Sequence, residues 1–408
     1  MAGNYYLQPP LKQTYYYILA IFTTYCALGD QTWWGFSQNS KFVRILFRVN
    51  YLLAHFLAPT LVVSEIWYLV MNFQDMNFNT KGTCFAFLPT TVLVVGYIAA
   101  TKQDCYIKVM KDFMVKIHLS NLEHQDDYVL KKRIQVEKLT RFTSYYLCSF
   151  LTLDWLAWCC VTGINSYHNK DYIQNKTRRL ETLIYVVLPF DYEYNLKYWA
   201  IVHTWNIYLI WAGCAIIIVH NITSYIFVFQ LIGHIEILKY RILNEFNQKL
   251  TQDEIGIKLI ELIKYHTYVL NIFKGIQNGF GVNVAMYYLY NLIATSLNLY
   301  QLMAGGEKRN AMVYALMLVF YFSALVVMSF ILEEIKRKSE GLSDAVYLID
   351  WVNMSLENRK IYIMFLMRIQ PALVFIAAGG MRAGILPMIS IAKTSFSLYV
   401  MLKEGMKT

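Results

Sequence analysis

The chain has 408 residues, of which 57% are hydrophobic, 16% aromatic and 16% charged. Ordinary soluble domains carry about 25% charged residues, so this composition argues against a soluble fold and favours a membrane protein with several spans. The formal net charge is +10, but the basic residues lie between apolar stretches without any nucleic-acid-binding motif, so nucleic acid is not an expected partner.

The first 40 residues lack the basic start and the cleavage site of a removable signal peptide, so the first span is expected to direct membrane insertion. Within them, Thr14–Leu28 is too short for a span. It is interpreted as an interfacial helix anchored by Trp33 and Trp34.

Seven later regions are long and apolar enough to cross a bilayer core, which takes about 20 residues in a helix. They are approximately Phe47–Val70, Cys84–Ala100, Phe142–Ile164, Tyr198–Phe229, Phe280–Met303, Ala311–Leu332 and a region within Ile361–Leu402. The last region would reach about 60 Å as one helix, so it is expected to break. The predicted breakers are Pro371, Gly379, Gly380, Gly384 and Pro387. They separate an inner helix, Leu356–Ile369, from a membrane helix, Ile385–Leu402.

Lys and Arg residues are concentrated between residues 102 and 141 and before the first span. Because cytoplasmic loops retain such residues, the N-terminus is predicted to be cytoplasmic and, after seven spans, the C-terminus extracellular. The expected fold class is an all-α polytopic membrane protein with this inverted topology. The sequon at Asn175 falls in the predicted outer loop and is a candidate glycosylation site.

The two long inner connections carry apolar residues at helical spacing, which predicts helices that continue into the cytoplasm and pack there. A membrane-surface amphipathic helix is the alternative. The predicted divisions are 1–40, a cytoplasmic segment; 41–101, spans one and two; 102–141, a cytoplasmic connection; 142–229, spans three and four with an outer loop at about 165–197; 230–279, a second cytoplasmic connection; 280–332, spans five and six; 333–370, the cytoplasmic half of the last helix; and 371–408, its membrane part and the C-terminus.

No metal-binding cluster, phosphate-binding glycine loop or catalytic motif is recognisable, so neither an enzyme nor a metal or cofactor is expected. Asp154 lies in the middle of span three, where a carboxylate costs about 2.5 to 3.5 kcal/mol. It either lines a cavity or is held in a buried hydrogen bond or protonated form. Glu65 in span one is interpreted as structural.

Ser390, Thr394, Ser397 and Met401 recur at intervals of four, three and four residues and share one face of the last helix. One interpretation is that the hydroxyls bond to their own helix or permit close packing. The other is a wetted face that lines an ion pathway, with Met401 as a hydrophobic constriction.

Seven spans also occur in G-protein-coupled receptors, but the predicted N-terminus is inside and the outer loop has no Cys. The chain also lacks an Asp-Arg-Tyr after span three and an Asn-Pro-x-x-Tyr in span seven. A transporter is less favoured because no inverted repeat is visible.

The end of the chain carries a series of specific motifs. They are Ala345-Val346-Tyr347, Trp351, Arg359-Lys360, Gln370-Pro371, Ala378-Gly379 and Thr394-Ser395-Phe396-Ser397-Leu398-Tyr399. With Leu-Pro-Phe-Asp at Leu188–Asp191, they closely resemble the signatures of insect odorant receptors. The chain lacks the ending of the sister gustatory receptors, and its 230–279 connection is shorter than that of the shared coreceptor. It therefore resembles a tuning subunit.

The resemblance implies an odorant- or pheromone-binding subunit of a heteromeric, ligand-gated, non-selective cation channel in the plasma membrane of olfactory sensory neurons. Four subunits, with coreceptor among them, would join through cytoplasmic anchor helices. Membrane lipid would surround the assembly, and no G protein would be required. The last helix would line the pore with Ser390, Thr394, Ser397 and Met401.

The resemblance also implies a pocket for a small hydrophobic volatile in the outer halves of spans two, three, four and six. On matching helical faces, the expected ligand-binding residues are Phe87, Thr91, Leu151, Trp155, Trp158, Trp199, His203, Asn206, Tyr314, Leu318 and Tyr321. Aromatic and apolar side chains with a few polar groups are the usual lining for such a ligand.

Overall fold

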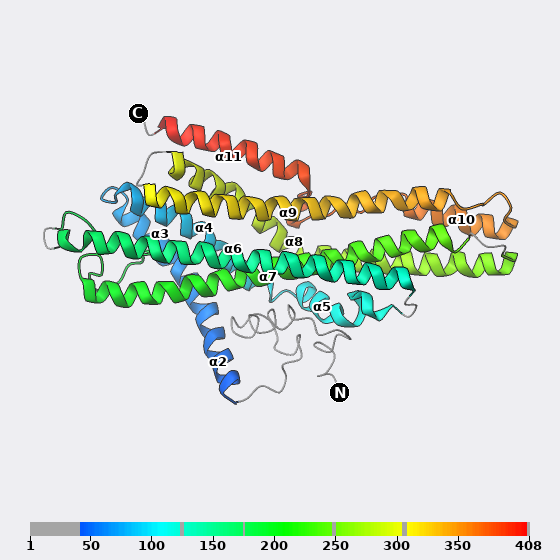
Figure 1. Ribbon diagram of the computed structural model, residues 1–408, viewed down its shortest axis with the longest axis horizontal. Helices are drawn as coiled ribbons and strands as arrows, with labels where there is room; N and C mark the ends of the chain where they lie inside the picture. The colour runs from blue at the N-terminus through cyan, green and yellow to red at the C-terminus, as the bar shows by residue number, and fades with distance from the viewer. Residues whose placement is uncertain (1–40, 123–125, 174–175, 247–249, 304–307, 406–408) are drawn as a thin grey trace.

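The computed structural model describes residues 41–122, 126–173, 176–246, 250–303 and 308–405, and these are almost entirely helical (Figure 1). The elements are α2 (Lys41–Leu52), η2 (Leu53–Leu57), α3 (Ala58–Asn72), α4 (Phe78–Ala100), α5 (Asp104–Asp112), η3 (Phe113–Ile117), η4 (Leu119–Asn121), α6 (Asp127–Asn169), η5 (Lys170–Tyr172), α7 (Leu196–Asn244), α8 (Gln252–Met303), α9 (Lys308–Tyr347), α10 (Leu356–Ile369), η6 (Ala378–Gly380) and α11 (Ile385–Gly405). The predicted interfacial helix Thr14–Leu28, its anchors Trp33 and Trp34, and Asn175 lie outside the described residues.

Four long helices, α6 to α9, run along the long axis of the molecule (Figure 1). They contain 43, 49, 52 and 40 residues, which corresponds to roughly 60 to 80 Å at 1.5 Å per residue. A bilayer core is only about 30 Å thick, so each helix extends well beyond one. The predicted connection 230–279 is accordingly formed by the end of α7 and the beginning of α8.

Local sequence signals set the starts of these long helices. Asn195 precedes α7, and its Oδ1 accepts hydrogen bonds from the backbone N–H groups of Lys197 and Tyr198, at 3.0 and 3.4 Å. Before α8, Thr251 and Glu254 bond reciprocally through side chain and backbone. These are an N-cap and a capping box, which satisfy backbone donors that have no partner within the helix.

Within the described residues, five helical segments are long and apolar enough to cross a membrane by length and composition. They are Arg48–Asn72, Phe78–Ala100, Asp127–Tyr172, Leu196–Asn244 and Asn310–Tyr347. The chain is thus a helical membrane protein with several apolar helices. Two of the seven predicted spans are not among the five: α8 is too polar, and the apolar part of α11, Ile385–Met401, is short.

The polarity of α8 has a structural reason, because this helix packs against α4, α7, α9 and α11. Its amide side chains Asn283, Asn291, Asn298 and Gln301 are each at most 3% exposed. A helix surrounded by other helices can carry polar groups that a lipid-facing helix excludes. The predicted fifth span is therefore a central helix of the bundle.

The first span is interrupted by a π-helical turn, η2, immediately before Pro59. Proline has no backbone N–H to donate and its ring crowds the preceding turn, so the regular hydrogen-bond ladder cannot continue through it. Single π-helical turns inside helices often lie at functional sites. Here Leu53 and Leu57, at the two ends of the turn, line the cavity described below.

The chain breaks between α10 and α11, as the glycines and prolines predict. Gly379, Gly380 and Gly384 have φ angles of 73°, 75° and 146°, a region that side chains rarely adopt. A Cβ on Gly384 would also lie 2.5 Å from Glu333 Oε2. The bounds of α10 coincide with the predicted inner helix, and α11 extends three residues past the predicted Leu402. It lies along one edge of the molecule (Figure 1) and packs on α8 and α9.

Candidate ligand-binding site

A cavity of about 110 Å³ lies between α2, η2, α3, α4, α6, α7 and α9. Its wall is mostly apolar and aromatic. The lining residues are Asn50, Leu53, Leu57, Ala58, Leu61, Phe87, Thr90, Thr91, Val94, Ile98, Asp154, Trp155, Trp158, Ile184, Tyr208, Leu209, Ile210, Ala212, Gly213, Cys214, Ile216, Met317 and Tyr321. For comparison, an engineered apolar cavity of about 150 Å³ accepts benzene. The cavity is therefore suited to a compact molecule.

Aromatic side chains from three helices form one part of this wall. The rings of Phe87 on α4 and Trp158 on α6 meet edge to face, with centroids 4.9 Å apart. Trp155 is held by a hydrogen bond from its Nε1 to the carbonyl of Ile207, at 3.1 Å. Tyr321 contributes from α9 and is 4% exposed. Close packing of this kind fixes the rotamers and gives the cavity a defined shape.

Two buried carboxyl groups lie at the same site. Asp154 lines the cavity and is 4% exposed, and its Oδ1 has no hydrogen-bond partner among the described residues. Glu65 on α3 accepts a hydrogen bond from Thr91 Oγ1, at 3.2 Å, and Thr91 itself lines the cavity. Of the two interpretations of Asp154, the structure places it in a cavity wall and gives Oδ1 no buried hydrogen bond.

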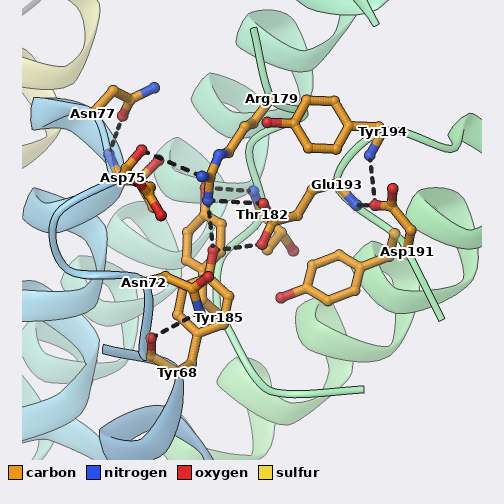
Figure 2. A network of polar contacts seen from close by, with 12 residues as sticks. Tyr68, Asn72, Asp75, Asn77, Arg179, Thr182, Tyr185, Asp191, Glu193 and Tyr194 are labelled. Atoms are coloured by element: carbon orange, nitrogen blue, oxygen red, sulfur yellow. Dashed lines mark hydrogen bonds and ion pairs between the residues drawn. The ribbon is translucent and has the colours of Figure 1, made fainter. Parts of the chain in front are cut away.

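The loop between η5 and α7 contributes Ile184 to the cavity and is tied to α3 by a polar network (Figure 2). Arg179 Nη1 lies 3.0 Å from Glu193 Oε2, and its Nη2 donates to the carbonyl of Asp75. Tyr68 on α3 donates a hydrogen bond to Glu193. Partial burial lowers the pKa of Arg179, but the Glu193 carboxylate and Tyr68 outweigh it and raise the pKa overall. The network therefore holds a charged pair in place at this end of the bundle.

The Leu-Pro-Phe-Asp motif lies in the same loop and has a local structural role. Asp191 Oδ1 accepts hydrogen bonds from the backbone N–H groups of Glu193 and Tyr194, each at 3.1 Å (Figure 2). This is an Asx-type turn, in which a short carboxylate substitutes for a backbone acceptor. The turn orients Glu193 toward Arg179.

Five of the eleven residues predicted to bind ligand line the cavity, and six do not. The five are Phe87, Thr91, Trp155, Trp158 and Tyr321. The other six are Leu151, Trp199, His203, Asn206, Tyr314 and Leu318. The three predicted on α7 instead support the loop: Trp199 Nε1 donates to the carbonyl of Glu181 and stacks on His203, while Asn206 Nδ2 donates to Thr182 and to the carbonyl of Ile184.

The remaining three lie beside the cavity. Leu151 is fully buried in the core, and Tyr314 packs edge to face behind Trp158 with centroids 5.3 Å apart. Leu318 is half-buried, and its neighbour Met317 lines the cavity instead. On α9 the cavity is therefore lined by Met317 and Tyr321, because helical spacing alone does not fix the rotation of a helix that is apolar on all sides.

The sequence prediction missed two groups of lining residues. Asn50, Leu53, Leu57, Ala58 and Leu61 come from the first span, which was not among the expected contributors. On α7 the cavity lies at residues 208 to 216, further along the helix than the predicted 199 to 206. Pro59 was the available signal for the first group, because a proline inside a span marks a local departure from regular helix.

The face of α11 that carries the predicted pore-lining residues lies away from this cavity. Ser390, Thr394, Ser397 and Met401 are all exposed, whereas Ser395 and Tyr399 face the bundle. Ser395 Oγ donates to the carbonyl of Leu292 on α8, at 3.2 Å, and Ser397 Oγ donates to the carbonyl of Lys393 in its own helix. In the part of the chain that is described, no group of three or more His, Cys, Asp or Glu residues could hold a metal ion.

A comparison with protein families decides the class of this molecule. Residues 81–396 match the family model described as 7tm Odorant receptor. The chain belongs to the insect odorant receptor family. Odorant receptor 30a of Drosophila melanogaster is 21% identical over 372 residues, covering 89% of this chain and 94% of that protein. The resemblance of the C-terminal motifs is thus confirmed at the level of the family, and the protein is an odorant receptor.

Solved structures show that this odorant receptor shares a known fold. The olfactory receptor OR5 from Machilis hrabei in complex with eugenol matches with a TM-score of 0.78 at 11% identity, covering 96% of this chain and 98% of that one. A second structure of OR5 from Machilis hrabei matches with a TM-score of 0.69 at 12% identity, covering 95% of this chain and 97% of that one. The predicted all-helical membrane fold is confirmed.

Proposed function

We propose that this odorant receptor is the tuning subunit of a heteromeric, ligand-gated, non-selective cation channel in the plasma membrane of olfactory sensory neurons. A volatile odorant or pheromone binds in the cavity, and its binding opens a central pore shared with coreceptor subunits. The N-terminus is cytoplasmic, the loop that holds Arg179 is extracellular, and no G protein is required. The short connection between α7 and α8 supports the assignment as a tuning subunit.

The observation that carries the proposal is the apolar and aromatic cavity between the first span, α4, α6, α7 and α9. Burial of apolar ligand surface contributes about 0.8 kcal/mol per CH₂ group. A compact odorant with about six to seven carbons therefore gains roughly 5 to 6 kcal/mol before the costs of association, which corresponds to an affinity weaker than micromolar. The related OR5 was solved with eugenol, which supports a small aromatic ligand.

The pore assignment draws its support from α11. Its hydroxyl-bearing face is exposed in the single chain, while its other face packs on α8 and α9. Placed around a central axis, four such faces would form a wetted path with Met401 as a hydrophobic constriction. The long α7, α8 and α9 helices, which extend beyond a bilayer, would supply the anchor that joins the subunits.

The test is to express the chain with and without coreceptor and to record membrane currents during application of a panel of volatiles. We expect currents that require both subunits and persist when intracellular GTP is replaced by a non-hydrolysable GDP analogue. Cells with coreceptor alone are the control. A response that requires GTP, or uptake of solute coupled to an ion gradient, would overturn the channel assignment.

A further inference from the structure

Two buried polar atoms on α6 are left without partners at the wall of the cavity. Asp154 Oδ1 and Trp158 Nε1 have no hydrogen-bond partner among the described residues. Both side chains line the cavity, and their residues are 4% and 3% exposed. They are four positions apart on one helix, so they lie on the same face.

The neighbouring polar side chains of the wall are already satisfied. Thr90 Oγ1 donates to the carbonyl of Ala86, and Thr91 Oγ1 lies within hydrogen-bond distance of Glu65. Trp155 Nε1 donates to the carbonyl of Ile207. Tyr208 donates to Asn50 at 3.3 Å. Among the residues of the wall, Asp154 and Trp158 therefore present one acceptor and one donor without a partner in the described part of the chain, and Glu65 Oε2, behind Thr91, is a further acceptor without one.

A buried polar atom without a partner is costly, so each such atom calls for an explanation, and at the wall of a cavity a bound molecule is one that can satisfy it. The group required here must donate to a carboxyl oxygen and accept from an indole N–H. A hydroxyl is the smallest group that does both. A single oxygen at hydrogen-bond distance from both polar atoms, about 2.7 to 3.0 Å from each, would satisfy the acceptor and the donor together.

We propose that the cavity recognises compact alcohols or phenols. The ligand hydroxyl donates to Asp154 Oδ1 and accepts from Trp158 Nε1, while the hydrocarbon part packs against Phe87, Met317 and Tyr321. Ethers and esters can only accept, and hydrocarbons can do neither. This inference names the ligand class of the proposed receptor and so rests on the proposed function.

The first test compares four molecules that share one ring: benzyl alcohol, benzyl methyl ether, toluene and benzylamine. Their binding is measured as the shift in thermal unfolding of the purified full-length chain, which needs no channel activity. We expect benzyl alcohol to bind at least about 10-fold more tightly than toluene, as the loss of a hydrogen bond to a charged or buried group implies. The ether should lie between them. Equal binding of alcohol and toluene, tightest binding of benzylamine, or no binding by any of the four would overturn the proposal.

Two variants each remove one of the two hydrogen bonds proposed for the ligand hydroxyl. Asp154→Leu should abolish the advantage of the alcohol over the ether, because it removes only the acceptor. Trp158→Phe should weaken alcohol and ether by similar factors and leave toluene nearly unchanged, because it removes only the N–H. Trp205→Phe, at an exposed tryptophan of α7 outside the cavity, is the matched control.

Membrane currents recorded for the same four molecules, with coreceptor present, separate the channel assignment from the ligand class. If no volatile produces current but the order of binding holds, the channel assignment fails and the ligand class stands. If currents appear but Trp158→Phe leaves the potencies of the alcohol and the ether relative to toluene unchanged, the ligand class fails and the channel assignment stands. Should Asp154→Leu not fold, Trp158→Phe alone decides between these outcomes.

Discussion

At the scale of single residues, the shape of the cavity depends on side chains outside its wall. Arg179 and Glu193 lie in the loop that supplies Ile184 to the cavity wall. Their side chains are only 16% and 13% exposed, so solvent screens the pair much less than a surface ion pair. The pair therefore contributes to both the stability of the loop and the shape of the site.

Glu193→Gln tests this role. The amide keeps the shape of the side chain but removes its charge, so we expect a loss of about 1 to 2 kcal/mol in the free energy of unfolding. The variant should also require a higher odorant concentration for half-maximal response. Thermal unfolding of the purified chain and dose–response currents measure the two effects. Glu261→Gln, at an exposed position of α8, is the control, and equal midpoints for the two variants would contradict the role.

His118 provides a pH-dependent contribution outside the apolar spans. Burial, and then the positive charge of Arg133 and the neighbouring His234, lower its pKa to about 3. The ordinary pKa of a histidine side chain is 6.5, so at pH 7 this proton is mostly absent from both the folded and the unfolded chain. As the pH falls below 6.5, the unfolded chain takes up the proton and the folded chain does not. Stability is therefore lost between pH 6.5 and about 3.

This predicts a loss of about 2 kcal/mol between pH 6.5 and pH 5, at roughly 1.4 kcal/mol per pH unit for one proton. In the native chain, His118 Nδ1 accepts a hydrogen bond of 3.1 Å from the backbone N–H of Ser120. His118→Asn removes the titrating group and keeps a side-chain acceptor for this N–H. The variant should flatten the pH dependence of thermal unfolding in this range. His168→Asn, at an exposed position, should leave the slope unchanged; identical slopes for both variants would refute the assignment.

At the scale of elements, close helix contacts depend on a few glycines. A Cβ on Gly279 of α8 would lie 2.5 Å from Cγ1 and 3.2 Å from Cβ of Val109 on α5. Val109 is 3% exposed and branched at Cβ, so it cannot turn away easily. The approach of α5 to α8 therefore requires glycine at this position.

Gly279→Ala should destabilise the chain by about 1 to 3 kcal/mol, the usual cost of overpacking. Gly163 on α6 offers a matched control, because nothing lies within 4 Å of the added methyl group. Gly163→Ala should be neutral or stabilising by up to about 1 kcal/mol through helix propensity. Comparable unfolding midpoints for the two alanine variants would show that α5 can move without loss.

The elements also show what the sequence predicts well and what it does not. The bounds of α10 and the break before α11 follow from local chemistry, because proline and glycine interrupt a helix whatever packs around it. The cavity does not follow in this way. The sequence predicts Leu318 and Trp199 in the lining, whereas the cavity is lined by Met317 and Tyr208, because the rotation and depth of an apolar helix depend on its neighbours. Asp154 stands out in the sequence because a carboxyl group inside a span is costly in any context.

At the scale of the whole molecule, the hydroxyl-bearing face of α11 has no packing partner within the described part of the single chain. Ser390, Thr394 and Ser397 are exposed on α11, at the edge of the bundle (Figure 1). Exposed hydroxyls gain little from lipid, whereas they are well suited to a water-filled path. The arrangement supports the proposed assembly, in which α11 would face a central axis.

Thr394→Val tests this arrangement in the proposed channel. Valine has nearly the same shape as threonine but lacks the hydroxyl, so it makes the path less favourable for hydrated ions. Recorded with coreceptor, the variant should have a lower unitary conductance and an unchanged order of odorant potency. Thr152→Val, at an exposed threonine of α6 whose hydroxyl donates to the carbonyl of Cys148, is the matched control. A change in odorant order without a change in conductance would place α11 at the ligand site instead of the pore, and then the single-chain cavity would have to account for gating by itself.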